Sequence, residues 1–447
     1  MRTRVCLAML AGLSAQVESS AAPVGSDALT TPHTPPSYRL LDATESEQVS
    51  QGQSVFDTQW VPAGTRDAAR REGLGPLFNA ASCDACHIDG ARGRGPIGEG
   101  PAPVALVIQL QSPSAGVGPE SIGDPVYGRV FNTAALDGVR VEGAVTIRYR
   151  EVEGYYYPDG IRWRMRVPHY QLIGTNRGPL ARTTIIKPRL APALFGVSLL
   201  EAVPETAISD DVAGARAGGG TAGKPAWQLH QGERILGRFG WQGESTSIRD
   251  QATKAFAREM GLTTADRASD DCTPVEVDCL RQHTGVSPEV SEELLGALVS
   301  FLRTLAVPVS PLNVDDESSG SEFFVAIGCA ACHRPQLPVE LPGPNGGKAP
   351  GVIAAYTDLR LHDLGVAMAD EDASGAKVVS KWRTAPLWGL GYRAKVESHP
   401  TFLHDGRARS TEEAILWHFG EAAPARRKFM SLLPRSREAL LRWLDTL

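Results

Sequence analysis

The sequence predicts a mainly α-helical protein whose two halves are related by a pseudo-two-fold axis, with a small β-hairpin insertion in the first half. The first observation is a short motif, C-x-x-C-H, that occurs at 83–87 and again at 329–333. The second is a series of matching segments that follows each motif in the same order. The third is that each half ends in an amphipathic segment of helical periodicity, EELLGALVSFLRTL at 292–305 and REALLRWLDTL at 437–447.

The matching segments indicate a repeat because chance similarity of single pairs would not preserve their order. Arg-Leu-Ala-Pro at 189–192 corresponds to Arg-Thr-Ala-Pro at 383–386, and an apolar segment with glycine follows each. Trp-Gln-Gly at 241–243 corresponds in the same way to His-Asp-Gly at 404–406. We therefore expect two related domains.

Length and charge limit the organisation further. The 447 residues are enough for about two or three domains at roughly 150 residues each. We expect an N-terminal domain at 51–307, with an insertion at about 100–180, and a C-terminal domain at 308–447. The net charge of -6 argues against nucleic acid as the main partner. No apolar run reaches the roughly 20 residues that a bilayer-spanning helix needs, so no membrane span is expected.

The insertion carries the signature of a β-hairpin. Residues 145–149 and 161–167 alternate apolar with polar side chains, and Pro158-Asp159-Gly160 lies between them as a turn.

The first residues are typical of a secretory signal peptide. Arg2 and Arg4 precede an apolar stretch at 5–13 and then small residues, which predicts a signal peptide at 1–22 followed by a flexible lead-in at 23–50. A short buried helix is the alternative. Export would place the mature protein in the periplasm, where disulfides persist. Cys272 and Cys279 are therefore expected to form a disulfide, the alternative being two unrelated buried thiols.

Each C-x-x-C-H motif holds the groups that covalent haem attachment requires. Two thiols form thioethers to the porphyrin vinyl groups, and the histidine that follows becomes the proximal iron ligand. A thioredoxin-like pair would not need a histidine after both motifs, and a zinc site would need both motifs together, whereas they stand in different halves. The sequence therefore predicts two haems c in cytochrome c-like domains, held by Cys83, Cys86, Cys329 and Cys332, with His87 and His333 on the irons.

Six segments resemble a known family: LFNAASCDACH, KPRLAPALFG, GRFGWQGESTSIRDQATKAFAREMG, YTDLRLHDLG, KWRTAPLWGLG and FLHDGRARSTEEAILWHFGEA. They resemble the bacterial di-haem cytochrome c peroxidase and MauG superfamily, most closely its di-haem oxidoreductase branch. The resemblance covers most of the chain from about Gly75 and is weakest in the hairpin insertion. It is specific for the superfamily and much less specific for the substrate.

The resemblance implies that the C-terminal haem is an electron-transfer centre whose distal ligand lies on the helix after His-Asp-Gly. The matching position is His418, where peroxidases of the superfamily usually carry methionine and MauG carries tyrosine. Histidine there suggests a bis-histidine iron of lower reduction potential than histidine–methionine ligation gives. The alternatives are an ordinary helix histidine at 418 and His362 as the ligand.

The resemblance implies that the N-terminal haem is the peroxidatic site. Trp241 matches the tryptophan that relays electrons between the haems, and Gln251 and Glu259 match the distal glutamine and glutamate, at a spacing two residues shorter than usual. A core tryptophan and an exposed helix carboxylate are the alternatives. After His87 the next histidine is His169, beyond the hairpin, so we expect an open first haem, with His169 as distal ligand the minority interpretation.

Other residues are expected to support the haems without reacting. Arg383 and Arg407 are candidates for contacts with haem propionates, although a solvated surface position would suit an arginine as well. His404 and Asp405 are candidates to anchor the turn before the ligand helix. The superfamily also implies calcium between the domains, but no contiguous acidic loop assigns its ligands.

Three functions fit these expectations. The first is a periplasmic peroxidase that takes electrons at the second haem from a small soluble donor, a cytochrome c or a copper protein, and reduces hydrogen peroxide at the first. The second is a MauG-like or rubber-oxygenase-like enzyme that oxidises a protein or an organic substrate. The third is an electron-transfer cytochrome without catalysis.

Overall fold

The computed structural model describes residues 43–66, 69–113, 122–209, 223–230, 232–282, 287–308, 317–342 and 347–447. The expected signal peptide at 1–22 and most of the lead-in lie outside these residues, as does the chain immediately after 308. Helix α1 (Ala43–Asp57) begins within the stretch expected to be a flexible lead-in.

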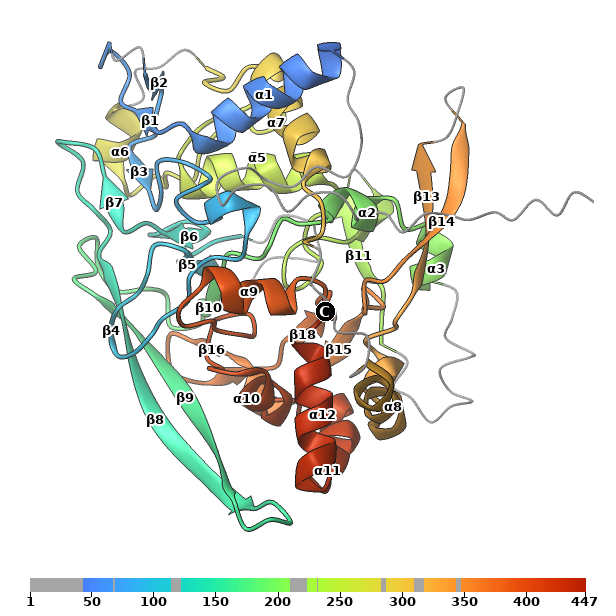
Figure 1. Ribbon diagram of the computed structural model, residues 1–447. Coiled ribbons are helices and arrows are strands. Elements are labelled where there is room, and N and C mark those ends of the chain that lie inside the picture. Colours follow the sequence, from blue (N-terminus) through green and yellow to red (C-terminus); the bar gives the residue numbers. More distant parts are fainter. Residues whose placement is uncertain are drawn as a thin grey trace, which may run out of the picture.

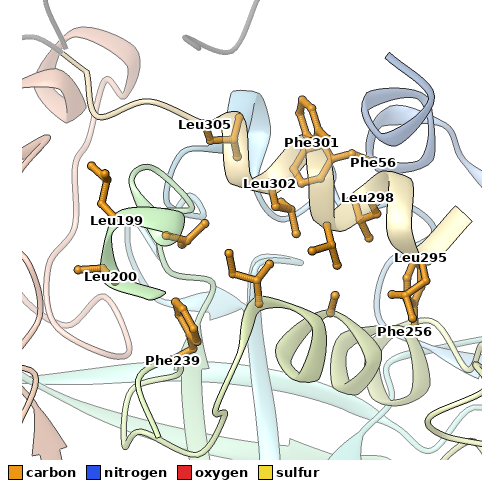
Figure 2. Close-up of a cluster of buried hydrophobic side chains, with 14 of the residues drawn as sticks. Phe56, Leu199, Leu200, Phe239, Phe256, Leu295, Leu298, Phe301, Leu302 and Leu305 are labelled. Carbon is orange, nitrogen blue, oxygen red and sulfur yellow. The ribbon is translucent and has the colours of Figure 1, made fainter. Parts of the chain in front are cut away.

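The helices of the first half enclose one apolar core. Helix α7 (Glu292–Thr304) lies along α1 and contacts α5 (Ile248–Glu259) and α2 (Val197–Glu201). Figure 2 shows the buried side chains between these helices, among them Phe56 of α1, Phe256 of α5 and Phe301 of α7. Ser247 and Ser291 cap α5 and α7 by accepting the backbone N–H three residues on, which satisfies a donor that the first helical turn leaves free.

The second half has a corresponding set of helices around its own core. Helix α8 (Glu317–Ile327) packs on α12 (Pro434–Leu444), and α11 (Ala423–Met430) and α10 (Thr411–Leu416) complete the group. In Figure 1 these helices lie at the opposite end of the molecule from α1, α5 and α7. Short helices α3 (Glu205–Ser209), α6 (Val277–Arg281) and α9 (Leu390–Val396) lie in the connections.

The repeat in the sequence corresponds to a repeat of local structure. Gly196 and Gly389, each after an Arg-x-Ala-Pro segment, adopt left-handed φ values of 66° and 76° at the start of α2 and α9, a conformation that favours glycine. Ser247 and Ser410 are the N-caps of α5 and α10, after Trp-Gln-Gly and His-Asp-Gly respectively.

Strands from both halves form one sheet. Its order is β17-β16-β10-β5-β6, built from β5 (Leu106–Gln111), β6 (Val130–Phe131), β10 (Ile185–Leu190), β16 (Asp370–Asp372) and β17 (Lys377–Val378). Ile185 pairs with Asp372 across the boundary between the halves. The halves are therefore joined by backbone hydrogen bonds as well as by side chains.

The insertion forms a long hairpin that reaches the second half. Strands β8 (Ala144–Tyr156) and β9 (Arg162–Ile173) pair antiparallel around the Pro158-Asp159-Gly160 turn, and β4 (Gly100–Pro101) adds to β8. In Figure 1 the hairpin runs along one side of the molecule past α10 to the level of α11. Phe429 of α11 packs edge-on against Tyr157 at the tip.

The expectation of a mainly α-helical fold is wrong, because 29% of the chain is helical and 25% is strand. The remaining strands are β1 (Trp60–Val61), β2 (Arg71–Glu72), β3 (Leu77–Phe78), β7 (Ala134–Ala135), β11 (Ala226–His230), β12 (Glu233–Gly237), β13 (Leu337–Pro342), β14 (Lys348–Ile353), β15 (Leu361–Asp363) and β18 (Lys381–Arg383). Six of these ten strands have only two or three residues, too few to show a period of two in the sequence. No helix among the described residues has the length and apolar character to cross a bilayer.

Candidate functional site

Both C-x-x-C-H motifs open into one cavity. It has a volume of about 610 Å³ and is lined by both motif histidines and all four motif cysteines, Cys83, Cys86, Cys329 and Cys332. Segments from both halves complete its walls, so the cavity lies where the two halves meet.

Each motif is wound into a single turn that brings its three groups together. The N–H of His87 donates to the Cys83 carbonyl at 3.0 Å, and the N–H of His333 donates to the Cys329 carbonyl at 2.9 Å. The four motif cysteines form no disulfide, whereas Cys272 and Cys279 are joined in one. Burial raises the pKa of the Cys83, Cys86 and Cys329 thiols to about 12. Each motif therefore places two cysteines next to a histidine, the groups to which a haem c is attached.

His87 has the environment of a metal ligand. Burial lowers the pKa of its imidazole to about 4, so the ring is neutral at pH 7 and has a lone pair to donate. Its Nδ1 is buried and has no hydrogen-bond partner within the described residues.

His333 and His418 face each other across the second part of the cavity. Their ring centroids are 6.4 Å apart. An iron with one imidazole nitrogen on each side, each about 2 Å away, separates the two ring centroids by about 6 Å. Nδ1 of His333 lies 3.0 Å from the Tyr356 carbonyl and Nδ1 of His418 lies 2.8 Å from the Ala414 carbonyl, which leaves both Nε2 atoms available. Burial lowers the pKa of both imidazoles, so the pair fits an iron held between them.

His362, the rival ligand, is occupied by two carboxylates. Its Nε2 lies 2.9 Å from Asp358 and its Nδ1 lies 2.9 Å from Glu421. Burial alone lowers the pKa of His362, but the hydrogen bonds to Asp358 and to the Cys332 sulfur, together with the charge of Asp358, raise it to about 11. A doubly protonated imidazole has no lone pair for iron, so His418 is the better candidate.

The His-Asp-Gly turn is held by stacking and by an ion pair. The ring of His404 stacks on Trp382 with centroids 3.8 Å apart, and burial lowers the pKa of His404 to about 3. Asp405 pairs with Arg407 at 2.8 Å and accepts a 2.8 Å hydrogen bond from the Tyr170 hydroxyl of strand β9. The geometry supports an anchoring role for His404 and Asp405.

Gln251 and Glu259 lie on the face of α5 that lines the cavity. Gln251, Ala255 and Glu259 follow one another at intervals of four residues, which places them along one side of the helix. The side-chain oxygen of Gln251 is buried without a partner within the described residues. Burial raises the pKa of the Glu259 carboxyl to about 7, against the opposing hydrogen bond from Asn79. Glu259 is therefore a half-buried carboxyl that lines the cavity at the first motif, and not an exposed helix residue.

Trp241 lies at the junction of the two halves. It lines the cavity, and its Nε1 donates to the Leu190 carbonyl at 2.8 Å. Its own carbonyl accepts the N–H of Arg383 at 2.9 Å, and its side chain packs against the core of the second half.

One of the two arginines expected at haem propionates lines the cavity. Arg383 lines the cavity, where burial lowers the pKa of its guanidinium to about 10. Arg407 is paired with Asp405 and is not among the lining residues. Three further arginines line the cavity: Arg92, which stacks over Trp241 at 5.0 Å, Arg393 and Arg426. They could not be predicted from the sequence because none of them belongs to a motif with a known role.

His169 and a calcium site receive no support from the described part of the chain. His169 is exposed on strand β9 and does not line the cavity. The groups of metal-ligating side chains among the described residues are Asp270 with the Cys272–Cys279 disulfide, and Cys332 with Asp358 and His362. Neither resembles the set of six to eight oxygen ligands that calcium prefers.

Comparison with known proteins identifies the family of the chain. A family model described as "Di-haem oxidoreductase, putative peroxidase" matches residues 181–447. No curated protein matches the chain. Among solved structures the chain is similar to hydrazine synthase from Kuenenia stuttgartiensis, in a structure pressurised with 20 bar xenon, at 13% identity over 100% of both chains and a TM-score of 0.36, which is too low to carry an argument. Since the family model covers more than half of the sequence, the chain belongs to the di-haem oxidoreductase family, whose cofactor is haem.

Proposed function

We propose that the protein is a periplasmic di-haem peroxidase that reduces hydrogen peroxide at the N-terminal haem with electrons that enter through the C-terminal haem. A small soluble cytochrome c or copper protein would supply the electrons. The observation that carries the proposal is the pair Gln251 and Glu259, a free amide oxygen and a half-buried carboxyl on one helix face next to the first motif.

We infer that thioethers at Cys83 and Cys86, and at Cys329 and Cys332, hold the two haems. His87 would bind the first iron, and His333 with His418 would bind the second. Bound haem supplies the redox-active iron that the reaction needs. With His418 as a second nitrogen ligand, that centre would be suited to electron transfer alone.

Glu259 is suited to move the proton that peroxide cleavage requires. Reduction of one peroxide consumes two electrons and two protons and yields two water molecules, and a proton must pass from one peroxide oxygen to the other as the O–O bond breaks. A carboxyl with a pKa of about 7 can accept and return that proton at neutral pH. The free oxygen of Gln251 can accept a hydrogen bond from the peroxide O–H and so orient the substrate.

Trp241 is suited to relay electrons between the halves. It lines the cavity shared by the two motifs, and its backbone and side chain contact both halves. The guanidinium of Arg92 lies over the Trp241 ring, and this cation–π contact helps to hold the indole in place.

The second candidate is an oxidase that acts on a protein or an organic substrate, in the manner of MauG or of rubber oxygenases. His418 at the position of the peroxidase methionine favours it. From the sequence, the hairpin could have shaped a substrate site. It packs along the second half instead, as the contacts of Tyr157 and Tyr170 show.

Mixing the haem-loaded protein with hydrogen peroxide and a reduced small cytochrome c tests the proposal. Rapid oxidation of the donor is expected, and Glu259→Gln should slow it by about 10²–10⁴-fold, the usual contribution of a general acid–base group. Glu47→Gln, on the exposed side of α1, is the control. A reaction with peroxide that leaves the donor reduced would favour the second candidate, and no spectral change at either iron would favour a purely electron-transferring cytochrome.

A further inference from the structure

The Glu259 carboxylate has a specific partner on the opposite side of the first motif. The side-chain amide of Asn79 donates to Glu259 Oε2 at 3.1 Å. The backbone N–H groups of Asn79 and Ala80 donate to the Glu259 carbonyl at 2.7 and 3.2 Å. Main-chain and side-chain contacts together therefore hold the end of α5 against the segment that precedes Cys83.

The orientation of the Asn79 amide is fixed by the insertion. Its Oδ1 accepts two hydrogen bonds from Thr133, from the backbone N–H and from the hydroxyl, both at 3.0 Å. Because the oxygen is committed to Thr133, the NH2 group must point towards Glu259. Strand pairing sets this geometry, since Phe78 of β3 pairs with Ala134 of β7 and so places their neighbours Asn79 and Thr133 side by side.

The groups around Glu259 have opposing effects on the pKa of its carboxyl, so the hydrogen bond from Asn79 influences which protonation state is favoured. Burial disfavours the carboxylate and raises the pKa of Glu259, and the charge of Asp271 acts in the same direction. Asn79 and the guanidinium of Arg258 oppose them. Cys86 lies close enough for the Glu259 charge to raise the pKa of its thiol. Once the thiol is converted to a thioether, it no longer titrates. A donor aimed at the carboxylate therefore favours its ionised, proton-accepting form.

We propose that Asn79 is the positioning residue that aims the Glu259 carboxylate into the cavity and keeps it able to accept a proton, with Thr133 of the insertion fixing the Asn79 amide. This inference rests on the proposed role of Glu259 in proton transfer. Residues next to β6 and β7, in the insertion, would then support the first haem site. The sequence did not predict this role for the insertion.

Infrared titration of the haem-loaded protein tests the proposal independently of turnover. The carboxylic C=O band that disappears in Glu259→Gln reports the protonation of Glu259 as the pH is raised. In Asn79→Leu its midpoint should rise by about one to two pH units, the equivalent of a hydrogen bond to a charged group. The rising limb of the pH profile for donor oxidation should move by the same amount.

Two further variants keep the test decisive. Asn79→Asp retains the oxygen that Thr133 needs and loses the donor to Glu259, so it should also raise the midpoint and can replace Asn79→Leu if the latter does not fold. Asn176→Leu, at an exposed asparagine whose amide donates to the Val141 carbonyl, is the control and should leave the midpoint unchanged.

An unchanged Glu259 midpoint in both Asn79 variants would overturn the inference. If Glu259→Gln turned over peroxide as fast as the unmodified protein, the proposed function would fail instead. The infrared midpoints would still report whether Asn79 controls the Glu259 proton, so the two failures are distinguishable.

Discussion

The backbone N–H of Arg166, on hairpin strand β9, donates a 2.7 Å hydrogen bond to the carboxylate of Glu413, on the helix that leads to His418. The Arg166 guanidinium also donates to the carbonyls of Gly406 and Arg407 in and beside the His-Asp-Gly turn, and to those of Pro96 and Ile97 in the first half. Hydrogen bonds from the insertion of the first half thus hold the helix before His418 and the His-Asp-Gly turn of the second half. We call these contacts of Arg166 the clamp.

Replacing Arg166 with alanine should destabilise the protein by about 3 kcal/mol, because several buried carbonyls would lose their donor at once. Denaturant unfolding of the haem-loaded protein measures the difference. Arg164→Ala is the matched control: Arg164 lies two residues away on the same strand, is exposed and forms an ion pair with the exposed Glu153. It should cost less than about 0.5 kcal/mol. Equal losses in the two variants would argue against the clamp.

Replacing His418 with methionine should raise the reduction potential of the second haem and leave the first unchanged. Histidine–methionine ligation favours ferrous iron more than two imidazoles do. Potentiometric titration followed by absorption measures both centres in one sample. His399→Met, at an exposed histidine in the same half, controls for the added thioether. If neither potential moved in His418→Met, His418 would not be an iron ligand.

The sequence was most informative where chemistry requires fixed spacing. The C-x-x-C-H motifs, and His418 after the His-Asp-Gly segment, are local patterns, and each lies where its neighbours along the chain would place it. Helical periodicity likewise identified α7 and α12.

Partners that are distant in the sequence were not predictable. The sheet depends on pairing of β10 with β5 and β16, which lie far from β10 in the sequence. Asn79 meets Glu259 only because β3 pairs with β7. Arg407 was expected to contact a propionate, but it pairs with Asp405, two residues earlier. The sequence does not show which way either side chain points, so this pairing could not be predicted.

Glu259 should make the protein less stable as the pH rises through neutrality. Its folded-state pKa of about 7 lies above the ordinary value of 4.5, so the folded state binds more protons than the unfolded state between these values. The contribution of Glu259 to the free energy of unfolding is on the order of 3 kcal/mol. It is fully present below about pH 4.5 and is lost as the pH rises through 7. Denaturant unfolding at pH 5 and pH 8 should show a smaller loss in Glu259→Gln than in the unmodified protein. Glu47→Gln should retain the full loss, and parallel pH profiles for all three proteins would contradict the assignment.

Serine substitution of the cysteines should separate the roles of the three pairs. Cys83→Ser with Cys86→Ser, and Cys329→Ser with Cys332→Ser, should each lower the mass of the denatured protein by one haem, because only thioethers survive denaturation.

Cys272→Ser with Cys279→Ser is the matched control, since it removes two cysteines that form a disulfide. It should leave the haem mass intact and cost about 2–3 kcal/mol of stability, the chain-entropy contribution of so short a loop. Asp271, the residue before Cys272, accepts the backbone N–H of Val130 at the start of β6, so loss of the disulfide is also expected to loosen the sheet edge next to Thr133. Intact mass spectrometry after denaturation, with unfolding curves for the same samples, decides the assignment. Loss of haem mass in the control, or its retention in either motif variant, would show that the thiols had been assigned to the wrong chemistry.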